Sequence, residues 1–416
     1  MGFWVNPPEE SGHANADCPP IVRSHCPVFT SVKKWYNNTA HDMGLYGFWV
    51  MTLIEGSSYR PSTVDCNPSW PPGEAIFERG IFWNCLRGAE FALVGDNIWL
   101  KDFIVANNKL GGLSIKESKS LRYEGEYGEY GMGIRDSTVI GYVDKTVPEL
   151  KMCTRFGVET PWSPNGFMSV EGIKFFNFDK SGTGQIDHCT AIDACYNSYP
   201  FDCGRTSQWE GVQYFNSARK FAADWEHETV LVDIDGSLTG MGAPGYSVVP
   251  KSALYPQSMC VDAPEFSVEF PCQICNSIEF SRYGMNNIKP DSLQGFNMDV
   301  KNKWGSSVVP FRNKRSTHTA GWMGILLSGE EHEMTWQNHE HITNVSYRGT
   351  IYDFGKSQHI VIRHPFFQEV DDATILGNKI TFDGDVALVG DTEESFLGEE
   401  KSVITTADDP LTYHID

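Results

Sequence analysis

Two aspartates separated by one residue are the side chains of this sequence best placed to do chemistry. Asp233 and Asp235 alternate along a predicted strand, so both side chains would point to one face, with Cα atoms about 7 Å apart. Two carboxylates in this arrangement can bind calcium or act as an acid/base pair on a sugar. Because Gly236 follows directly, the pattern favours an Asp-Gly turn whose carboxylates cap backbone amides, with the calcium site and the acid/base pair as alternatives.

A second acidic stretch, from Asp179 to Asp187, matches part of the calcium-binding EF-hand loop. Oxygen-bearing side chains occupy loop positions 1, 3, 5 and 9, and Gly184 occupies position 6. Thr190 stands where the EF-hand has its glutamate, and the preceding residues alternate like a strand instead of forming a helix. The pattern favours a turn, with a calcium loop of another kind at Asp179 and Asp187 as the alternative.

Cysteine and histidine form no recognisable catalytic motif. Cys272 and Cys275 make one Cys-x-x-Cys pair, but a second pair with zinc-site spacing is absent, which favours disulfide chemistry. His339 and His341 share one strand face in a histidine-rich C-terminal part, where ordinary surface histidines are the simpler interpretation. The sequence also lacks a Gly-x-Ser-x-Gly elbow, a phosphate-binding loop and a dinucleotide fingerprint. A role other than catalysis is therefore favoured.

The charge balance excludes several classes of partner. The 416 residues include 54 acidic and 33 basic ones, which gives a formal net charge of −21. Nucleic acid and anionic membranes both require clustered lysine and arginine, so neither is an expected partner. No apolar run approaches the roughly 20 residues of a membrane-spanning helix. We expect no membrane span within this chain.

Cysteine usage and glycosylation sequons indicate an oxidising compartment. The 11 cysteines cluster in loop-like segments, as in disulfide-bonded extracellular proteins. The disulfide candidates are Cys18, Cys26, Cys189, Cys195, Cys203, Cys260, Cys272 and Cys275. Asn37 and Asn344 begin the two usable sequons and are the predicted glycosylation sites. Because the first residues lack the pattern of a signal peptide, we expect that Met1 is not the natural start of the gene product.

Repeated sequences predict the elements that position these residues. Asn84 and Asn107 each follow a short apolar run and lie 23 residues apart, about one turn of a parallel β-helix. Such a turn cannot bury its apolar face alone, so further copies should stack on both sides. A shared Glu-Gly-(Ile/Val)-x-(Phe/Tyr)-Phe-Asn sequence occurs at 171–177 and 210–216. We expect stacked asparagines to form hydrogen-bonded ladders.

The same argument predicts that the stacked turns of the β-helix are already present at residue 1. The sequence Gly-Phe-Trp-Val occurs at 2–5 and again at 47–50, 45 residues later. Asn38 precedes Asn84 by 46 residues. Both spacings correspond to about two turns of a β-helix.

The predicted class is all-β, a parallel β-helix followed by a smaller antiparallel β-sandwich-like domain. Glycine and proline are frequent, with 39 and 22 residues, and runs with helical spacing are missing. We place the β-helix, with cysteine-rich loop insertions, at 1–308, the antiparallel domain at 309–392 and an acidic tail at 393–416. The second domain would cover the exposed edge of the last turn.

Several of these motifs resemble a known family. The sequence Trp-Tyr-Asn-Asn-Thr-Ala-His at 35–41 with Gly-Leu-Tyr-Gly-Phe-Trp at 44–49 resembles the β-helix region shared by fibrocystin, fibrocystin-L and the cell-surface, cell-migration-inducing hyaluronidases. Asp-Ile-Asp-Gly-Ser-Leu-Thr-Gly at 233–240 resembles a signature late in the same region. The residues 259–264 fit the segment that follows, and Arg-Ser-Thr-His at 315–318 is similar to the start of the family's C-terminal β domain.

The resemblance implies an extracellular or membrane-tethered protein. It also implies a right-handed parallel β-helix built from PbH1-type repeats, and an upstream G8 domain that this sequence does not show. The residues at 43–49 are more similar to the fibrocystin branch of the family.

We therefore expect an extracellular structural or interaction module of a fibrocystin-like surface protein. It would belong to a larger assembly at the cell surface or ciliary surface and contact other extracellular proteins or glycans. One alternative is a polysaccharide-active, hyaluronidase-like enzyme that uses Asp233 and Asp235. A second is non-catalytic binding of glycans or calcium, with calcium at Asp233 and Asp235 or at Asp179 and Asp187. No other cofactor is expected.

Overall fold

The computed structural model describes residues 1–6, 30–51, 59, 73–92, 97–115, 132–143, 153–161, 168–179, 189–194, 206–223, 229–268, 270–289, 291–293, 295–309, 321–338, 346–352, 360–364 and 411–415. These residues form β-strands and turns, with short 3-10 segments at Gln257–Met259, Pro264–Phe266 and Asp291–Leu293. The expectation of an all-β chain with parallel and antiparallel sheets is confirmed. Within these ranges no helix is long and apolar enough to cross a membrane.

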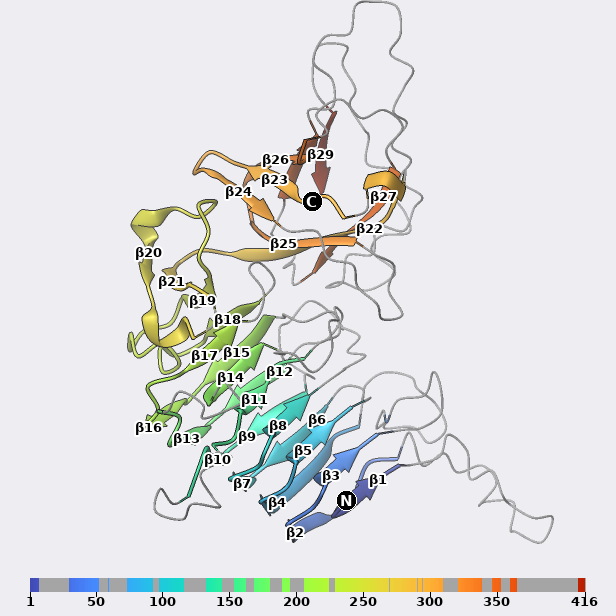
Figure 1. Ribbon diagram of the computed structural model, residues 1–416, viewed down its shortest axis with the longest axis vertical. Helices are drawn as coiled ribbons and strands as arrows, with labels where there is room; N and C mark the ends of the chain where they lie inside the picture. The colour runs from blue at the N-terminus through green and yellow to red at the C-terminus, as the bar shows by residue number, and fades with distance from the viewer. Residues whose placement is uncertain are drawn as a thin grey trace, which may run out of the picture.

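A parallel seven-stranded sheet forms one side of the N-terminal part (Figure 1). Each strand pairs in parallel with the next, although 19 or more residues of chain separate them. In spatial order the strands are β1 (Phe3–Val5), β3 (Tyr46–Val50), β5 (Arg87–Phe91), β8 (Gly111–Ile115), β11 (Phe156–Glu159), β14 (Thr190–Ala194) and β17 (Phe221–Ala223).

A second, larger sheet contains two arms of parallel strands. The first arm contains β6 (Ile98–Lys101), β9 (Met132–Arg135), β12 (Met168–Glu171), β15 (Thr206–Glu210) and β18 (Val230–Asp233). The second arm contains β7 (Ile104–Ala106), β10 (Thr138–Ile140), β13 (Lys174–Phe176) and β16 (Gln213–Phe215). The long strands β2 (Trp35–His41) and β4 (Ala75–Trp83) run through both arms. The chain passes through the first arm, the second arm and the seven-stranded sheet in turn, and we call one such pass a coil.

Residues in the left-handed backbone conformation mark the two bends beside the second arm. Between the arms, φ lies between +48° and +70° at Asn37, Arg79, Asp102, Asp136, Gly172 and Gly211. After the second arm, φ lies between +49° and +61° at Asp42, Asn84, Asn107, Asn177 and Asn216. Glycine, asparagine and aspartate tolerate this conformation best. This requirement explains why the same few residue types recur at equivalent positions of successive coils.

Side chains of the following coil accept backbone N–H groups just after the bends. Ser137 Oγ accepts the N–H of Phe103 at 3.1 Å, and Ser217 Oγ accepts the N–H of Phe178 at 3.2 Å. A buried amide without a partner would cost free energy, so a small polar residue is required at these positions.

The predicted asparagine ladder is confirmed. Asn107 Nδ2 donates to Asn84 Oδ1 at 2.7 Å, and Asn84 Nδ2 donates to Asp42 Oδ1 at 3.2 Å. Two coils further on, Asn216 Nδ2 donates to Asn177 Oδ1 at 2.9 Å. These side chains hold the bends in place.

The expected two-turn spacing at the N-terminus is wrong. Phe3 pairs directly with Phe48 in adjacent strands, so the two Gly-Phe-Trp-Val sequences are one coil apart. Asn38 pairs with Gly80, which likewise places it one coil away from the region of Asn84. The connections between coils differ in length, so a residue count of 45 does not fix the number of coils.

Aromatic side chains fill the interior of the first coils. Phe48, Phe77, Phe82, Phe91 and Phe103 are fully buried. The ring centroids of Phe48 and Phe77 lie 5.1 Å apart, and those of Phe82 and Phe103 lie 5.7 Å apart. Contacts of this kind stabilise the stack beyond the area that they bury.

Antiparallel strands take over after β18. The larger sheet continues with β19 (Tyr246–Pro250), β21 (Cys272–Asn276) and β20 (Cys260–Asp262), each antiparallel to its neighbour. The change from parallel to antiparallel pairing therefore falls between Asp233 and Tyr246. The domain ranges 1–308, 309–392 and 393–416 stay a prediction.

Two further sheets form the C-terminal part, in the upper half of Figure 1. One contains β25 (Gly321–Leu327), β22 (Phe280–Lys289) and β27 (Ser346–Tyr352), and the other contains β24 (Ser306–Val309), β23 (Met298–Lys301), β26 (Glu331–Trp336), β28 (Ile360–His364) and β29 (Leu411–Ile415). Both sheets contribute side chains to one buried cluster, including Trp322 and Trp336. β26 and β28 pair in parallel, so this part is mixed and not purely antiparallel. β29 pairs with β28, although it lies in the range expected to be an acidic tail.

Candidate functional site

Asp233, at the end of β18, is 1% exposed and holds the turn that follows it. Its Oδ1 accepts the N–H groups of Gly236 at 2.9 Å and Leu238 at 3.2 Å. Its Oδ2 accepts the N–H of Thr239 at 2.8 Å and the hydroxyl of Thr239 at 2.6 Å. Both oxygens are therefore occupied by the protein's own donors.

Asp235 is exposed and binds a different set of amides. Its Oδ2 accepts the N–H of Gly211 at 2.9 Å, and its Oδ1 accepts the N–H of Ser237 at 2.9 Å. Ser237 Oγ donates to Asp235 and accepts the N–H of Val212 at 2.8 Å. Burial raises the pKa of Asp235, but the hydrogen bonds from Ser237 and Gly211 outweigh it, and the pKa lies below its ordinary value.

The motif at 233–240 caps the last parallel coil. One coil earlier, the N–H of Gly172 donates to the backbone oxygen of Glu210 at 2.8 Å. Gly211 occupies the equivalent bend, but its N–H donates to the Asp235 carboxylate instead. The structure has the Asp-Gly turn that the sequence favoured, because Asp233 is buried and the carboxylates of Asp233 and Asp235 both accept backbone N–H groups. A catalytic or calcium role for them stays a prediction that this geometry does not favour.

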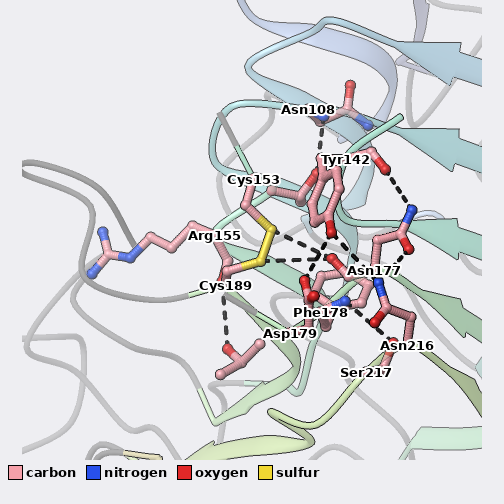
Figure 2. Close-up of a disulfide and its surroundings, with 12 residues drawn as sticks. Asn108, Tyr142, Cys153, Arg155, Asn177, Phe178, Asp179, Cys189, Asn216 and Ser217 are labelled. Carbon is pink, nitrogen blue, oxygen red and sulfur yellow. Dashed lines mark hydrogen bonds between the residues drawn. A yellow bond between two sulfur atoms is a disulfide. The ribbon is translucent and has the colours of Figure 1, made fainter. Parts of the chain in front are cut away.

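The other calcium candidate lies beside a disulfide (Figure 2). Tyr142 Oη donates to Asp179 Oδ1 at 2.9 Å. Asp187 lies outside the described residues, so a calcium loop at Asp179 and Asp187 stays a prediction. In the part of the chain that the structure describes, no three or more His, Cys, Asp or Glu side chains gather so that they could hold a metal ion.

The disulfide between Cys153 and Cys189 links adjacent coils. The two cysteines precede β11 and β14, which pair with each other. Sequence reasoning included Cys189 among the candidates but missed Cys153. The signal that could have found Cys153 is its place shortly before a strand, like Cys189, one coil earlier.

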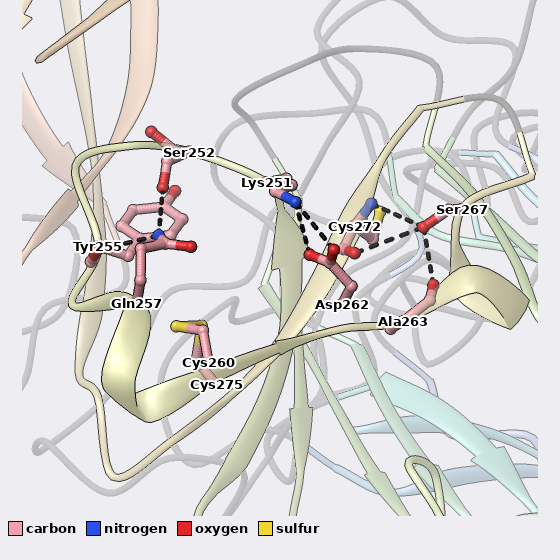
Figure 3. A network of polar contacts seen from close by, with 10 residues as sticks. All are labelled: Lys251, Ser252, Tyr255, Gln257, Cys260, Asp262, Ala263, Ser267, Cys272 and Cys275. Carbon is pink, nitrogen blue, oxygen red and sulfur yellow. Dashed lines mark hydrogen bonds and ion pairs between the residues drawn. A yellow bond between two sulfur atoms is a disulfide. The ribbon is translucent and has the colours of Figure 1, made fainter.

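A second disulfide joins Cys260 of β20 to Cys275 of β21, where the two residues lie directly opposite each other (Figure 3). Cys272 is a free, buried thiol, so its expected disulfide is wrong. The physical reason is register, because Cys275 faces the Cys260 thiol and Cys272 lies three residues away on the same strand. Burial raises the pKa of Cys272 to about 12.

The remaining predicted sites divide into one that the structure describes and several that it does not. Asn37 is exposed at the bend between the arms, with φ of +56°, and its glycosylation stays a prediction. Outside the described residues lie Cys18, Cys26, Cys195, Cys203 and Asn344.

A buried ionic cluster that sequence reasoning missed lies on the seven-stranded sheet. Arg87 Nη1 donates to Glu159 Oε2 at 2.9 Å, and Arg87 Nε lies 3.3 Å from Glu90 Oε2. Ser114 also donates to Glu159 Oε2. Burial lowers the pKa of Arg87, but Glu159 and Glu90 outweigh it and raise that pKa above its ordinary value. Arg87 and Glu159 are 72 residues apart, so only the stacking of coils brings them together.

An exposed aromatic row adjoins this cluster. The Trp4 side chain is 45% exposed and stacks on Trp49 with a centroid distance of 5.7 Å. Trp49 also stacks on Tyr46 at 4.8 Å and donates from Nε1 to Glu90 Oε1 at 3.1 Å. Aromatic faces beside polar groups are suited to contacts with sugars or with other proteins.

Known proteins share the sequence that builds these features. Over 374 residues, 89% of this chain, the sequence is 32% identical to fibrocystin-L of Mus musculus, and the match covers 8% of that protein. Over 379 residues, 90% of this chain, it is 31% identical to fibrocystin-L of Homo sapiens, again covering 8% of that protein. These similarities support a relationship between this chain and the fibrocystin family. Fibrocystin of Mus musculus is 24% identical over 336 residues, which cover 79% of this chain and 7% of that protein.

The fibrocystin similarity extends over both the parallel and the antiparallel parts of the chain, because it covers 89% of the residues. The chain spans about 8% of the length of the fibrocystin-L proteins that it matches. No family model matches the chain. The similar proteins are fibrocystins, and they do not show the relationship to hyaluronidases that the motifs suggested.

Proposed function

We propose that this chain is a structural and interaction segment of a fibrocystin-like protein at the cell surface or ciliary surface. The observation that carries the proposal is that the carboxylates of Asp233 and Asp235 accept hydrogen bonds from the protein's own backbone. The motif at 233–240 was the strongest candidate for a calcium or acid/base site, and its carboxylates bind backbone amides at the end of the parallel array. Its residues build a scaffold, and partners would bind to the surfaces that the scaffold presents.

In this proposal the stacked coils form a right-handed parallel β-helix of PbH1-type repeats. Three observations support it, namely the in-register pairing of successive coils, the left-handed residues at equivalent bends, and the common interior that the strands enclose. The C-terminal sheets would then close the helix as a sandwich-like domain within the predicted ranges 309–392 and 393–416.

The proposed extracellular location has separate support. Two disulfides lie in the described part of the chain, and disulfides persist in oxidising compartments. The sequon at Asn37 is exposed on a bend and is open to glycosylation. Expression in secreting animal cells should give a product whose mass falls on enzymatic deglycosylation. An Asn37→Gln variant should lose that part of the mass change, and an unchanged mass would count against the location.

A test with two readouts separates the scaffold from an enzyme. We expect the secreted chain to leave hyaluronan and other glycosaminoglycans intact, while Asp233→Asn combined with Asp235→Asn lowers the unfolding temperature. The matched control is Asp262→Asn, which changes an exposed aspartate paired with Lys251. Depolymerisation by the wild-type chain that disappears in the double variant, but not in the control, would overturn the proposal and establish the polysaccharide-active alternative.

Non-catalytic glycan binding is the second candidate, because Trp4 and Trp49 offer a partly exposed aromatic row. Sugar rings stack on such faces, and the hydrogen bond from Trp49 to the buried Glu90 holds the Trp49 ring in place. Titration calorimetry with glycosaminoglycan oligosaccharides should then show heat that a Trp4→Ala variant lacks. Equal heats for both proteins, or none for either, would remove this candidate. The same titration with calcium chloride tests the calcium alternative.

A further inference from the structure

Arg79 departs from the rule that governs the bends of this chain. It lies within β4 at the bend between the two arms, with φ of +57°. The described part of the chain has 12 left-handed residues other than glycine, of which ten are asparagine or aspartate and one is the small Ser277. Apart from glycine, only short polar side chains adopt this conformation readily, so a long arginine there carries backbone strain. Such strain points to a function for the side chain.

The contacts of Arg79 within the protein do not require an arginine. Its Nε lies 4.0 Å from Asp102 Oδ2, at the limit of an ion pair, and its side chain is 56% exposed. Its Cζ lies 5.0 Å from the centroid of the Tyr36 ring. Contacts as exposed as these contribute little stability. In the part of the chain that the structure describes, the guanidinium donates no hydrogen bond, so its N–H groups are available to a ligand.

A second cation lies against the same tyrosine ring as Arg79. Lys34 Nζ is 5.5 Å from the ring centroid, and Lys33 is the residue before it. Both lysines are exposed, and neither forms an ion pair among the described residues. Glu78, which precedes Arg79, is already paired with Lys101 at 3.3 Å. The first two coils therefore carry a local positive surface on a chain whose formal net charge is −21.

We propose that Arg79 and Lys34 bind the acidic group of an anionic glycan, either a sulfate ester or the carboxylate of an acidic sugar. The guanidinium offers its N–H groups as a planar fork, which matches two oxygens of such a group. Tyr36 is 38% exposed beside both cations, so a sugar ring can rest against it. The proposal goes beyond the scaffold role, which needs no ligand, and it uses a different sheet from the row of Trp4 and Trp49.

The distribution of charge limits the ligand to single acidic groups on a flexible chain. At the equivalent bends of the next two coils the residues are Asp102 and Asp136. A bilayer or a nucleic acid is wide enough to meet these carboxylates as well, and like charges repel. A glycan carries its acidic groups at intervals and can place one of them on the first two coils. Unlike an acidic peptide, it also has a ring to place against Tyr36.

Titration calorimetry tests the proposal, with Asn37→Gln in every protein so that no glycan occupies the neighbouring bend. The probes are a heparin hexasaccharide, which has sulfate esters and carboxylates, and a hyaluronan hexasaccharide, which has carboxylates alone. We expect Arg79→Asn to weaken the binding of the heparin probe about tenfold or more, and added salt to weaken binding by the background protein. Binding of the heparin probe alone would assign the site to sulfate esters, and similar binding of both would assign it to carboxylates.

Two further variants control for charge. Arg79→Lys should restore only part of the binding, because lysine keeps the charge without the planar fork. Lys174→Asn is the matched control, since it removes an exposed cation from the second arm and changes the net charge equally. We expect the Lys174→Asn protein to bind the heparin probe as the background protein does.

Thermal unfolding separates a binding role of Arg79 from a structural one. Asparagine tolerates the left-handed backbone, so the Arg79→Asn protein should unfold at the same temperature as the background protein or at a higher one. A lower unfolding temperature would show that the contacts with Tyr36 and Asp102 account for the arginine, and it would overturn the proposal.

Four binding results would also overturn the proposal. The first is a background protein that binds neither probe. The second is equal weakening by Arg79→Asn and Lys174→Asn. The third is binding of a poly-glutamate peptide as tightly as the heparin probe. The fourth is binding that Trp4→Ala removes and Arg79→Asn does not, which would place the glycan on the aromatic row instead.

Discussion

At the scale of single residues, polar side chains replace backbone partners wherever the stacked coils cannot provide them. Asp235 and Ser237 do so at the last coil, and Ser137 and Ser217 do so at earlier bends. The sequence could predict an Asp-Gly turn at Gly236. It could not predict which amides the turn would cap, because Gly211 lies 24 residues away and is brought close only by stacking.

Removing the Asp235 carboxylate should destabilise the end of the parallel array. Asp235→Ala leaves the N–H of Gly211 without its acceptor, and we expect the free energy of unfolding to fall by about 1–2 kcal/mol. Urea denaturation measures the change. Asp262→Ala removes an exposed carboxylate paired with Lys251 and should cost under about 1 kcal/mol. A larger loss for Asp262→Ala would contradict the capping role.

The contribution of Asp235 should also depend on pH. Its folded pKa lies below the ordinary value of 3.8, so the unfolded state binds more protons as the solution is acidified. The stability that Asp235 contributes is then fully present above about pH 5 and is lost as the pH falls through its folded pKa. The difference between wild type and Asp235→Ala should therefore shrink in urea titrations carried out at progressively lower pH.

At the scale of elements, the repeated sequences predicted the strands correctly but did not predict the number of coils between two repeats. Asn84 and Asn107 are 23 residues apart and occupy equivalent bends, as their spacing predicted. The repeated Gly-Phe-Trp-Val sequence gave the right pairing partner and the wrong number of coils. A strand's own alternation is a local property, whereas the length of a connection between coils is not limited by the stacking of the strands.

A glycine in the seven-stranded sheet should tolerate no larger residue. A Cβ at Gly88 would lie 2.6 Å from the carbonyl oxygen of Gly112 and 2.9 Å from Val105 Cγ1. Overpacking of this kind costs about 1–3 kcal/mol, so Gly88→Ala should lower the unfolding temperature measured by circular dichroism. Gly44→Ala is the matched control, because no atom lies within 4 Å of its added Cβ. Similar losses for both variants would contradict close packing of the coils at Gly88.

Strand β26 contains a histidine that must stay neutral. His332 is buried, and its Nε2 accepts the N–H of Leu327 at 3.2 Å. Burial lowers the pKa of His332 from 6.5 to about 4. Between these two values the unfolded state binds more protons than the folded state, so stability falls as the pH decreases. Charging the imidazole would also remove the acceptor of the Leu327 N–H.

The pH dependence of unfolding checks the role of His332. We expect the free energy of unfolding to drop by about 3 kcal/mol between pH 7 and pH 4 on account of this residue. His332→Gln cannot take up a proton and should show a shallower slope in the same window. Parallel slopes for wild type and variant would show that His332 titrates normally.

At the scale of the whole molecule, composition and pattern predicted the class of fold but not the contacts between distant residues. The all-β class follows from frequent turns and short alternating strands. The Arg87–Glu159 contact has no local signal, because 72 residues separate the partners. The disulfide of Cys153 joins residues 36 apart, and its only signal is the place of each cysteine shortly before a strand. A change to antiparallel strands was predicted, but the partners of β22 were not, since β22 pairs with strands that begin more than 30 residues later.

The two disulfides should contribute unequally to stability. Cys153 and Cys189 close a loop with a separation of 36 residues, and Cys260 and Cys275 close one of 15. Loop-closure entropy predicts losses of about 4 kcal/mol for the first bond and about 3 kcal/mol for the second. Denaturant unfolding of the Cys153→Ser, Cys189→Ser and the Cys260→Ser, Cys275→Ser variants measures both. A reversed order would show that folded-state contacts outweigh loop length.

The pairing of Phe82 with Val105 makes one coil a removable unit of length. Deleting residues 83–105 joins Phe82 to Ala106, so every later side chain keeps its inward or outward position. Deleting residues 83–104 instead joins Phe82 to Val105 and turns an inward residue outward. We expect the first deletion to unfold cooperatively and the second to lose its β-sheet circular dichroism. A protein of this kind can therefore change length by whole coils, while a change of a single residue within a strand is not tolerated.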